Sequence, residues 1–150
     1  MIDKELSRRT FLRALSGMTL LGLVSACSTT ESSDQDEQKR KLADLRASKK
    51  YKEKKIEVGD NYYSPKQTTI EEATFVVWTN EGRSIHDVMW DDTDLDRKSE
   101  DFTSDTLRAG DIHVFLFEKP GTYFYHCHFH GGPKRGQWGS IKVNSTDRTL

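Results

Sequence analysis

The chain has 150 residues, a formal net charge of −1 and a hydrophobic fraction of 34 %. Because positive and negative charges nearly balance, they give no reason to expect a nucleic-acid partner or adsorption to an anionic membrane surface. The length allows one domain with additional segments, and the low hydrophobic fraction predicts that some of these segments are polar and lie outside the core.

Residues 1–26 have the sequence features of an export signal. Arg8 and Arg9 precede an apolar run from Phe11 to Ala26, as in twin-arginine signals. The run is too short, and too rich in serine, threonine and glycine, to favour a bilayer span. Small residues then precede Cys27, which resembles the processing box of lipoproteins, whose cysteine is lipidated. The resemblance implies export to the periplasm or the outer cell surface, with a lipid anchor at Cys27. The alternative is a plain membrane anchor with an incidental cysteine.

Residues 27–55 are predicted to be the lipidated N-terminus followed by a polar linker. The stretch from Gln38 to Lys55 is rich in lysine, arginine and glutamate, and part of it has helix-forming character. Leu42 and Leu45 are its only large aliphatic residues, too few for an apolar stripe that packing would bury. We therefore expect a solvated spacer.

From residue 56 onward, short strand-forming segments alternate with turn residues, which predicts a single all-β domain over residues 56–145. Strands at this spacing indicate a β-sandwich, and about 90 residues are enough for one modest core. The predicted strands are Lys55–Val58, Thr68–Ile70, Thr74–Trp78, Asp87–Trp90, Asp105–Leu107, Ile112–Phe117, Tyr123–His126 and Gly139–Val143. The predicted core residues are Phe75, Val77, Ile112, Val114, Leu116, Phe124, Ile141 and Val143.

An acidic connection from Asp91 to Asp105 interrupts these strands. Its aspartates at positions 92, 94 and 96 have the alternating spacing of a calcium-binding loop. Arg97 replaces the glycine that such a loop requires, however, and no glutamate follows at the closing position. We therefore interpret this segment as a solvated loop.

The segment Gly121–Gly139 carries the densest concentration of metal-binding side chains. It contains Cys127 and three of the five histidines. Cys127 and His130 follow a strand-like run, and a thiolate paired with an imidazole suits copper or zinc. A zinc site would normally add a second cysteine or histidine pair, and the rest of the chain holds no such pair. One thiolate with two imidazoles and a weak fourth ligand is instead the donor set of blue-copper electron-transfer sites.

This segment resembles the copper loop of the cupredoxin family, in particular of its plastocyanin and halocyanin branch. The residues that carry the resemblance are Gly121, Tyr123, Tyr125, Cys127, His130 and the glycine-rich loop that follows. Upstream, Glu81–Val88 comes after the predicted strand at Thr74 and resembles the family's first-histidine segment. The resemblance extends over roughly residues 56–144.

The resemblance implies a Greek-key β-sandwich that binds one type 1 copper ion through His86, Cys127 and His130. It also implies a monomer that carries single electrons between redox protein partners and is not an enzyme, with His130 at the electron exit. Backbone groups of residues 80–85 are expected to donate hydrogen bonds to the sulfur.

Gln137 occupies the place where the family usually has an axial methionine. Glutamine can replace that methionine through its amide oxygen, so the resemblance implies that Gln137 is the axial ligand. Because oxygen is a harder donor than a thioether, this ligand is expected to favour Cu(II) and to lower the reduction potential. The alternative is a loop amide that faces solvent.

The remaining histidines are predicted to lie at the surface. His126 and His128 flank Cys127, and neighbours on an extended chain point to opposite faces, so neither is expected to join Cys127. His113 is expected on a strand surface. The His-Cys-His pattern also occurs in multicopper oxidases, but their next copper ligand would fall on Gly132, and the additional histidine pairs of those enzymes are absent from this sequence.

Two alternatives to an electron carrier stay open. The extra histidines would permit a second, more open metal position, as in a copper-handling protein, a sensor or a small copper enzyme. The other alternative is a β-sandwich that binds zinc or no metal. Because the sequence shows no pairing of a nucleophile with a base, a carrier is the preferred interpretation.

Overall fold

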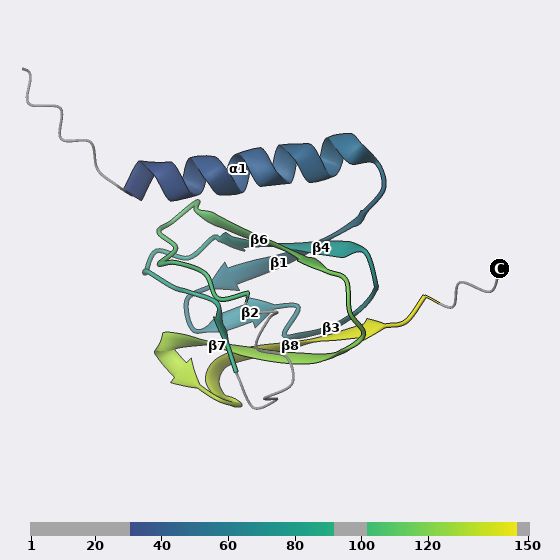
Figure 1. Cartoon of the computed structure of the whole chain (residues 1–150). Helices are drawn as coiled ribbons and strands as arrows, with labels where there is room; N and C mark the ends of the chain where they lie inside the picture. Colours follow the sequence, from purple (N-terminus) through teal and green to yellow (C-terminus); the bar gives the residue numbers. More distant parts are fainter. Residues whose placement is uncertain (1–30, 92–101, 147–150) are drawn as a thin grey trace, which may run out of the picture.

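The computed structural model describes residues 31–91 and 102–146. A helix, α1 (Glu31–Ser48), lies across a two-layer β-sandwich (Figure 1). The strands are β1 (Lys52–Gly59), β2 (Tyr62–Ser64), β3 (Gln67–Glu71), β4 (Thr74–Asn80), β5 (Met89–Trp90), β6 (Ile112–Phe117), β7 (Gly121–Gly132) and β8 (Arg135–Asn144). The prediction of an all-β sandwich is confirmed.

Some of the predicted features lie outside the described residues. These are the export signal, Cys27 and the part of the acidic connection between residues 92 and 101. Within the described part of the chain, no helix is both long enough and apolar enough to cross a membrane.

Each layer of the sandwich is a four-stranded sheet with one parallel pair. The first sheet has the order β2-β1-β4-β6, with β1 parallel to β4, and the second has the order β3-β8-β7-β5, with β3 parallel to β8. All other neighbouring strands are antiparallel. Strands β1, β4 and β7 all end on the left in Figure 1. His86 follows the end of β4, and Cys127 and His130 lie near the end of β7, so these three residues are found at this end of the sandwich.

The predicted strands occur with some differences in their bounds. Strand β6 has the predicted bounds, and β1, β3, β4, β7 and β8 are longer than predicted. Strand β5 is shorter, because it begins at Met89 and not at Asp87. The segment Asp105–Leu107 contributes only an isolated bridge between Leu107 and His86. Strand β2 was not predicted, because three residues are too few to show an alternating pattern.

The core between the sheets is built around Trp78. Its indole stacks on Phe102 with 5.8 Å between ring centroids, and Tyr125 meets it edge-on at 5.7 Å. Of the predicted core residues, Ile141 and Val143 belong to this cluster. Phe124 lies on the other face of β7, half-buried beneath the ammonium group of Lys134, and is not part of either core cluster.

The predicted core residues of β4 and β6 lie on the outer face of their sheet. Phe75, Val77 and Val114 form a second buried cluster there, separate from the core between the sheets. Strand β4 is buried on both faces. When both faces of a strand are apolar, alternation alone does not indicate which face meets the other sheet.

Helix α1 covers this second cluster. Leu42 and Leu45 pack against it, together with Tyr51. Residues 31–48 therefore differ from the solvated spacer that was expected. Two leucines are enough to pack the helix onto the sheet, because the outer face of the sheet supplies the rest of the apolar surface.

Side-chain amides of α1 also cover the free edge of β6. Gln35 donates a hydrogen bond to the carbonyl oxygen of Ile112 at 3.1 Å and accepts one from its N–H at 2.9 Å. Gln38 accepts a hydrogen bond from the N–H of Val114 at 2.9 Å. Because an unpaired strand edge invites pairing with another chain, these glutamines protect the edge of the sheet.

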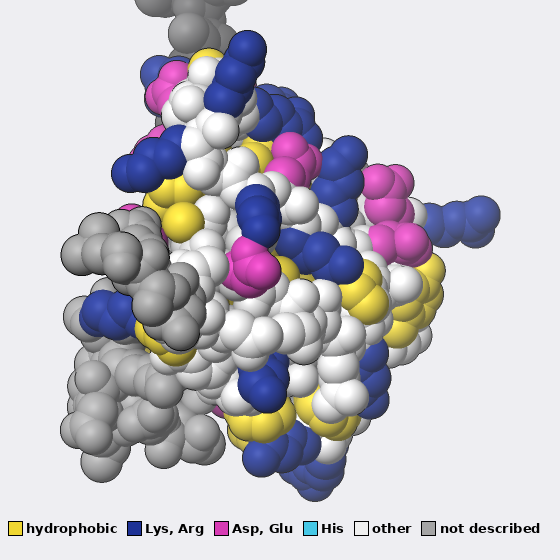
Figure 2. Space-filling view, turned by 90° about the vertical axis from the view of Figure 1, so that its right-hand side faces the viewer, with side chains coloured by type: hydrophobic (Ala, Val, Ile, Leu, Met, Phe, Trp, Pro, Cys, Tyr) yellow, Lys and Arg dark blue, Asp and Glu magenta, His cyan; other side chains and the backbone are white. Residues whose placement is uncertain are grey.

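The opposite end of the sandwich carries interspersed charges. Figure 2 shows basic and acidic side chains mixed over this end of the molecule. Arg46 pairs with Glu53 at 2.6 Å, and Lys52 pairs with Glu71. Exposed pairs of this kind contribute little to stability.

Candidate metal centre

His86 is placed by a turn that follows β4. Asn80, the buried last residue of β4, donates hydrogen bonds of 2.9 Å to the carbonyl oxygens of Ser84 and Leu107, and it accepts one from the N–H of Gly82 at 2.9 Å. The backbone of His86 then pairs with that of Leu107. These bonds fix the turn and leave His86 with 0 % of its surface exposed.

Cys127 and His130 are brought together by an irregularity in β7. His126 pairs with Trp138 and Gly131 pairs with Gly136, so residues 127–130 lie opposite Gln137 alone. A bulge of this kind bends a strand and changes the direction of its side chains. Cys127 faces the core, and His130 returns toward its sulfur.

The turn after the bulge depends on glycine. A Cβ atom on Gly131 would lie 2.6 Å from the carbonyl oxygen of Arg135, and Gly136 has a φ of +62°. Side chains at either position would push the two strands apart. The glycine-rich composition of the loop is therefore what allows the hairpin to fold back over Cys127.

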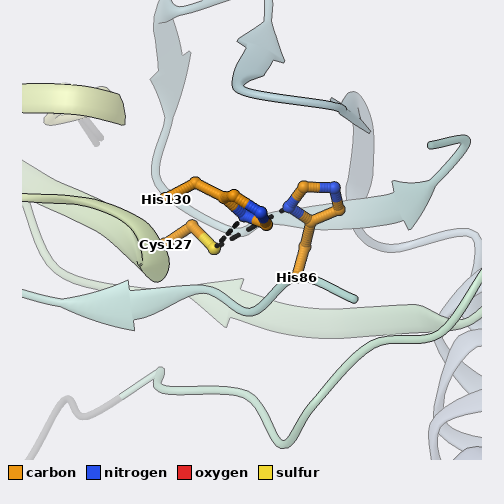
Figure 3. A group of neighbouring side chains, drawn as sticks. All are labelled: His86, Cys127 and His130. Atoms are coloured by element: carbon orange, nitrogen blue, oxygen red, sulfur yellow. Dashed lines mark hydrogen bonds between the residues drawn. The ribbon is translucent and has the colours of Figure 1, made fainter. Parts of the chain in front are cut away.

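His86, Cys127 and His130 form one compact group (Figure 3). The Nδ1 atoms of His86 and His130 lie 3.8 and 3.5 Å from the sulfur, and the potential ligand atoms all lie within 4.8 Å of one another. Within residues 31–91 and 102–146, this is the one group of three histidine, cysteine or acidic side chains close enough to share a metal ion. The structure therefore brings together the three ligands that the sequence predicts.

Gln137 lies opposite the bulge, and its side chain is buried. Only 1 % of its surface is exposed, and its Nε2 donates hydrogen bonds of 3.1 Å to the carbonyl oxygens of Gly59 and Tyr62. Its Oε1 is buried without a hydrogen-bond partner among the described residues. A buried acceptor of this kind calls for an explanation. The alternative of a loop amide that faces solvent is wrong.

The sulfur of Cys127 is surrounded by backbone donors. Burial raises the pKa of the Cys127 thiol, whereas hydrogen bonds from the backbone of Asp87, Phe129 and His130 act in the opposite direction. These donors belong to residues 87, 129 and 130, so the expectation that residues 80–85 would supply them is not met.

Two buried carboxylates hold the histidines that flank Cys127. Asp87 accepts hydrogen bonds from the ring Nδ1 of His128 and, at 2.9 Å, from its backbone N–H, while Asp91 accepts one from Nδ1 of His126. The His128 side chain is 53 % exposed, as predicted, but that of His126 is only 14 % exposed. Neither carboxylate was predicted from the sequence. The position of Asp87, next to His86, was the available signal.

A third carboxylate contacts His86. Oδ1 of Asp60 lies 3.1 Å from Nε2 of His86 and accepts hydrogen bonds from the N–H groups of Ser84 at 3.1 Å and Arg83 at 3.2 Å. The hydrogen bonds from Ser84, His86 and Arg83, in this order of effect, lower the pKa of Asp60 to about 2. This contact was not predictable from local sequence patterns, because Asp60 stands among turn residues 26 positions before His86.

His113 takes a structural position away from the group. It is buried, its Nε2 donates a hydrogen bond of 2.6 Å to the carbonyl oxygen of Phe102, and its ring lies 5.5 Å from that of Trp78. The prediction of a strand-surface histidine is therefore wrong. Phe102 lies against the aromatic side chains on this face of β6, and its carbonyl oxygen covers the ring nitrogen of His113.

No family model matches the sequence, and no curated protein matches it. Solved structures match over about three fifths of the chain. A purple cupredoxin from Nitrosopumilus maritimus is 28 % identical over 60 % of this chain and 98 % of its own, with a TM-score of 0.49. A Cu(I) amicyanin variant is 21 % identical over 61 % of this chain and 82 % of its own, with a TM-score of 0.52. The chain has a cupredoxin fold.

The cupredoxin fold also occurs as one part of larger proteins. A copper-containing nitrite reductase from Thermus scotoductus is 23 % identical over 61 % of this chain, with a TM-score of 0.51, but the match covers only 22 % of that protein. In the present chain, the cupredoxin-like sandwich is covered on one face by α1 (Figure 1).

Proposed function

We propose that this protein binds one type 1 copper ion and carries single electrons between redox protein partners. His86, Cys127 and His130 would be its three principal ligands, with Oε1 of Gln137 as the axial donor. The observation that carries the proposal is a buried thiol that lies 3.8 and 3.5 Å from the Nδ1 atoms of two imidazoles.

The donor set fits copper better than the other common metals. A soft thiolate with two imidazoles suits copper or zinc, but structural zinc sites normally have four cysteine or histidine ligands. The fourth candidate here is the neutral amide oxygen of Gln137, which is buried opposite the β7 bulge and has no hydrogen-bond partner among the residues that the structure describes. Copper in such a site supplies one-electron exchange between Cu(I) and Cu(II).

The protein residues would keep the site rigid and dry. His86, Cys127 and Gln137 are each at most 1 % exposed, so the surrounding chain excludes water from these ligand atoms. The turn at Asn80 and the β7 bulge fix the backbone on either side. A rigid arrangement that needs little rearrangement between the two oxidation states allows fast electron transfer.

His130 would be the point of electron exit. It is half-buried, unlike His86, and it lies next to Phe129, which is 39 % exposed. Ile85, beside His86, and Tyr62 are the other large hydrophobic residues exposed in the described part of the chain. Apolar side chains beside the site suit the brief contacts made by electron-transfer partners. We propose that the carrier acts as a monomer.

A copper-handling protein or a small copper enzyme remains the alternative. Such a protein needs an open metal position that a substrate or a second protein can reach. The burial of three of the four proposed ligands favours the carrier.

Copper and electron stoichiometry distinguishes these functions. We expect one tightly bound copper ion per chain, and we expect reductive titration of the Cu(II) form to consume one electron per chain. Reoxidation by a one-electron acceptor should restore the starting form without consumption of any other reactant. A second copper ion bound with similar affinity, or catalytic turnover of nitrite or peroxide, would favour the alternative.

We also propose that the protein is exported and held at the membrane by a lipid on Cys27, in the periplasm or at the outer cell surface. The order of twin arginines, apolar run and small residues before Cys27 supports this proposal. Because α1 begins at Glu31, the sandwich would be tethered close to the membrane surface.

Replacement of Cys27 by serine is expected to abolish lipidation. The variant should move from the membrane fraction to the soluble fraction or keep its unprocessed signal, and mass spectrometry of the N-terminal peptide should no longer detect a lipid adduct. Cys127→Ser is the matched control and should leave the protein in the membrane fraction. An unmodified Cys27 in the wild-type protein would refute the lipid anchor.

A further inference from the structure

Asp60 contacts the side of the His86 ring that faces away from Cys127. Nδ1 of His86 lies 3.8 Å from the sulfur, and Nε2 lies 3.1 Å from Oδ1 of Asp60. An ionised carboxylate only accepts hydrogen bonds, so Nε2 carries the proton and donates it. The lone pair of Nδ1 is then directed toward Cys127, as a metal ligand requires.

The carboxylate itself is fixed by the turn that carries His86. The N–H groups of Arg83 and Ser84 both donate hydrogen bonds to Asp60. A Cβ atom on Gly82 would lie 2.6 Å from Oδ1, so the glycine allows this close approach. These hydrogen bonds connect the β1–β2 turn to the turn after β4 at this point.

We infer that Asp60 is a positioning residue that holds His86 in its ligating tautomer and biases the centre toward its oxidised state. This inference rests on the proposed copper function. A carboxylate that accepts a hydrogen bond from a ligand imidazole fixes the ring and makes its free nitrogen a stronger donor. Its negative charge also stabilises Cu(II) more than Cu(I), because the interaction grows with the charge of the ion.

The two effects of Asp60 are separated by two substitutions. Asp60→Asn removes the charge but keeps an oxygen that can accept the hydrogen bond from His86. Asp60→Ala removes both. Glu71→Gln is the matched control, because it neutralises another exposed carboxylate at the end of β3, on the opposite end of the sandwich.

The first measurement is nitrogen NMR of the His86 ring in the metal-free protein. Wild type, Asp60→Asn and Glu71→Gln are expected to show a single tautomer with the proton on Nε2, whereas Asp60→Ala should show a mixture of tautomers. The second measurement is the reduction potential of the copper-loaded proteins. Glu71→Gln is expected to have the reduction potential of wild type, whereas that of Asp60→Asn should be higher. At the potential where wild type is half reduced, Asp60→Asn should therefore be mostly reduced.

Failure of this inference is distinguishable from failure of the proposed function. If wild type takes up Cu(II) with an intense thiolate band but Asp60→Asn and Glu71→Gln share its potential, the bias attributed to Asp60 is refuted and the copper function stands. If wild type forms no such band, the copper function fails. The NMR measurement needs no metal, so a single His86 tautomer in Asp60→Ala would refute the positioning role in either case. If Asp60→Ala does not fold, the reduction potential of Asp60→Asn still tests the inference.

Discussion

Replacement of Gln137 by methionine is expected to raise the reduction potential of the copper-loaded protein by at least about 60 mV, which corresponds to roughly a tenfold change in the ratio of oxidised to reduced protein at a fixed potential. The amide oxygen is a hard donor that favours Cu(II), whereas a thioether is a soft donor that favours Cu(I). Protein film voltammetry or a redox titration followed by visible absorption measures the shift.

The control for this substitution is Gln67→Met. Gln67 is the exposed first residue of β3, so the same chemical change there should leave the potential unaltered. If Gln137→Met has the potential of wild type, Gln137 is not a ligand. Its buried Oε1 would then need another partner.

Replacement of Trp78 by alanine is expected to lower the free energy of unfolding by about 3–5 kcal/mol, because it removes a fully buried indole and leaves a cavity. Trp78 contacts aromatic rings from both sheets and from the segment at Phe102, so the neighbouring side chains cannot easily close this space. Urea denaturation of the metal-free protein measures the loss.

Trp138→Ala is the matched control for this substitution. Trp138 is half-buried on β8, where the ammonium group of Lys66 lies 4.1 Å from its ring centroid. Its loss is expected to cost about 1 kcal/mol, which is typical of a partly exposed side chain. If Trp78→Ala is too unstable to purify, Trp78→Phe should show a smaller loss in the same direction. Equal losses in Trp78→Ala and Trp138→Ala would contradict the position of Trp78 at the centre of the core.

The candidate ligand group of His86, Cys127 and His130 was predictable because most of the sequence pattern that indicates it is local. Cys127 and His130 are three residues apart, and the aromatic strand before them and the glycines after them fix their surroundings. His86 could be added because its segment follows a clear strand signal. Alternation correctly put His126 on the face of β7 opposite Cys127, but it did not indicate that β5 and the buried Asp91 lie beside that ring, so the partial burial of His126 was missed.

The supporting carboxylates and the covering helix were not predictable from local patterns. Asp60 reaches His86 because the β1–β2 turn meets the turn after β4, and this contact exists only in the folded chain. The leucines of α1 are too few to suggest burial, but β4 offers a second apolar face that they complete. Composition described the polarity of each segment correctly, and tertiary packing decided which segments became buried.

The most direct test of the proposed centre is the visible absorption spectrum of the protein with one equivalent of Cu(II), measured beside Cys127→Ser. We expect an intense thiolate-to-copper charge-transfer band in wild type and in Cys27→Ser, and no such band in Cys127→Ser. A colourless wild-type protein, or a band of equal intensity in Cys127→Ser, would contradict the type 1 copper centre.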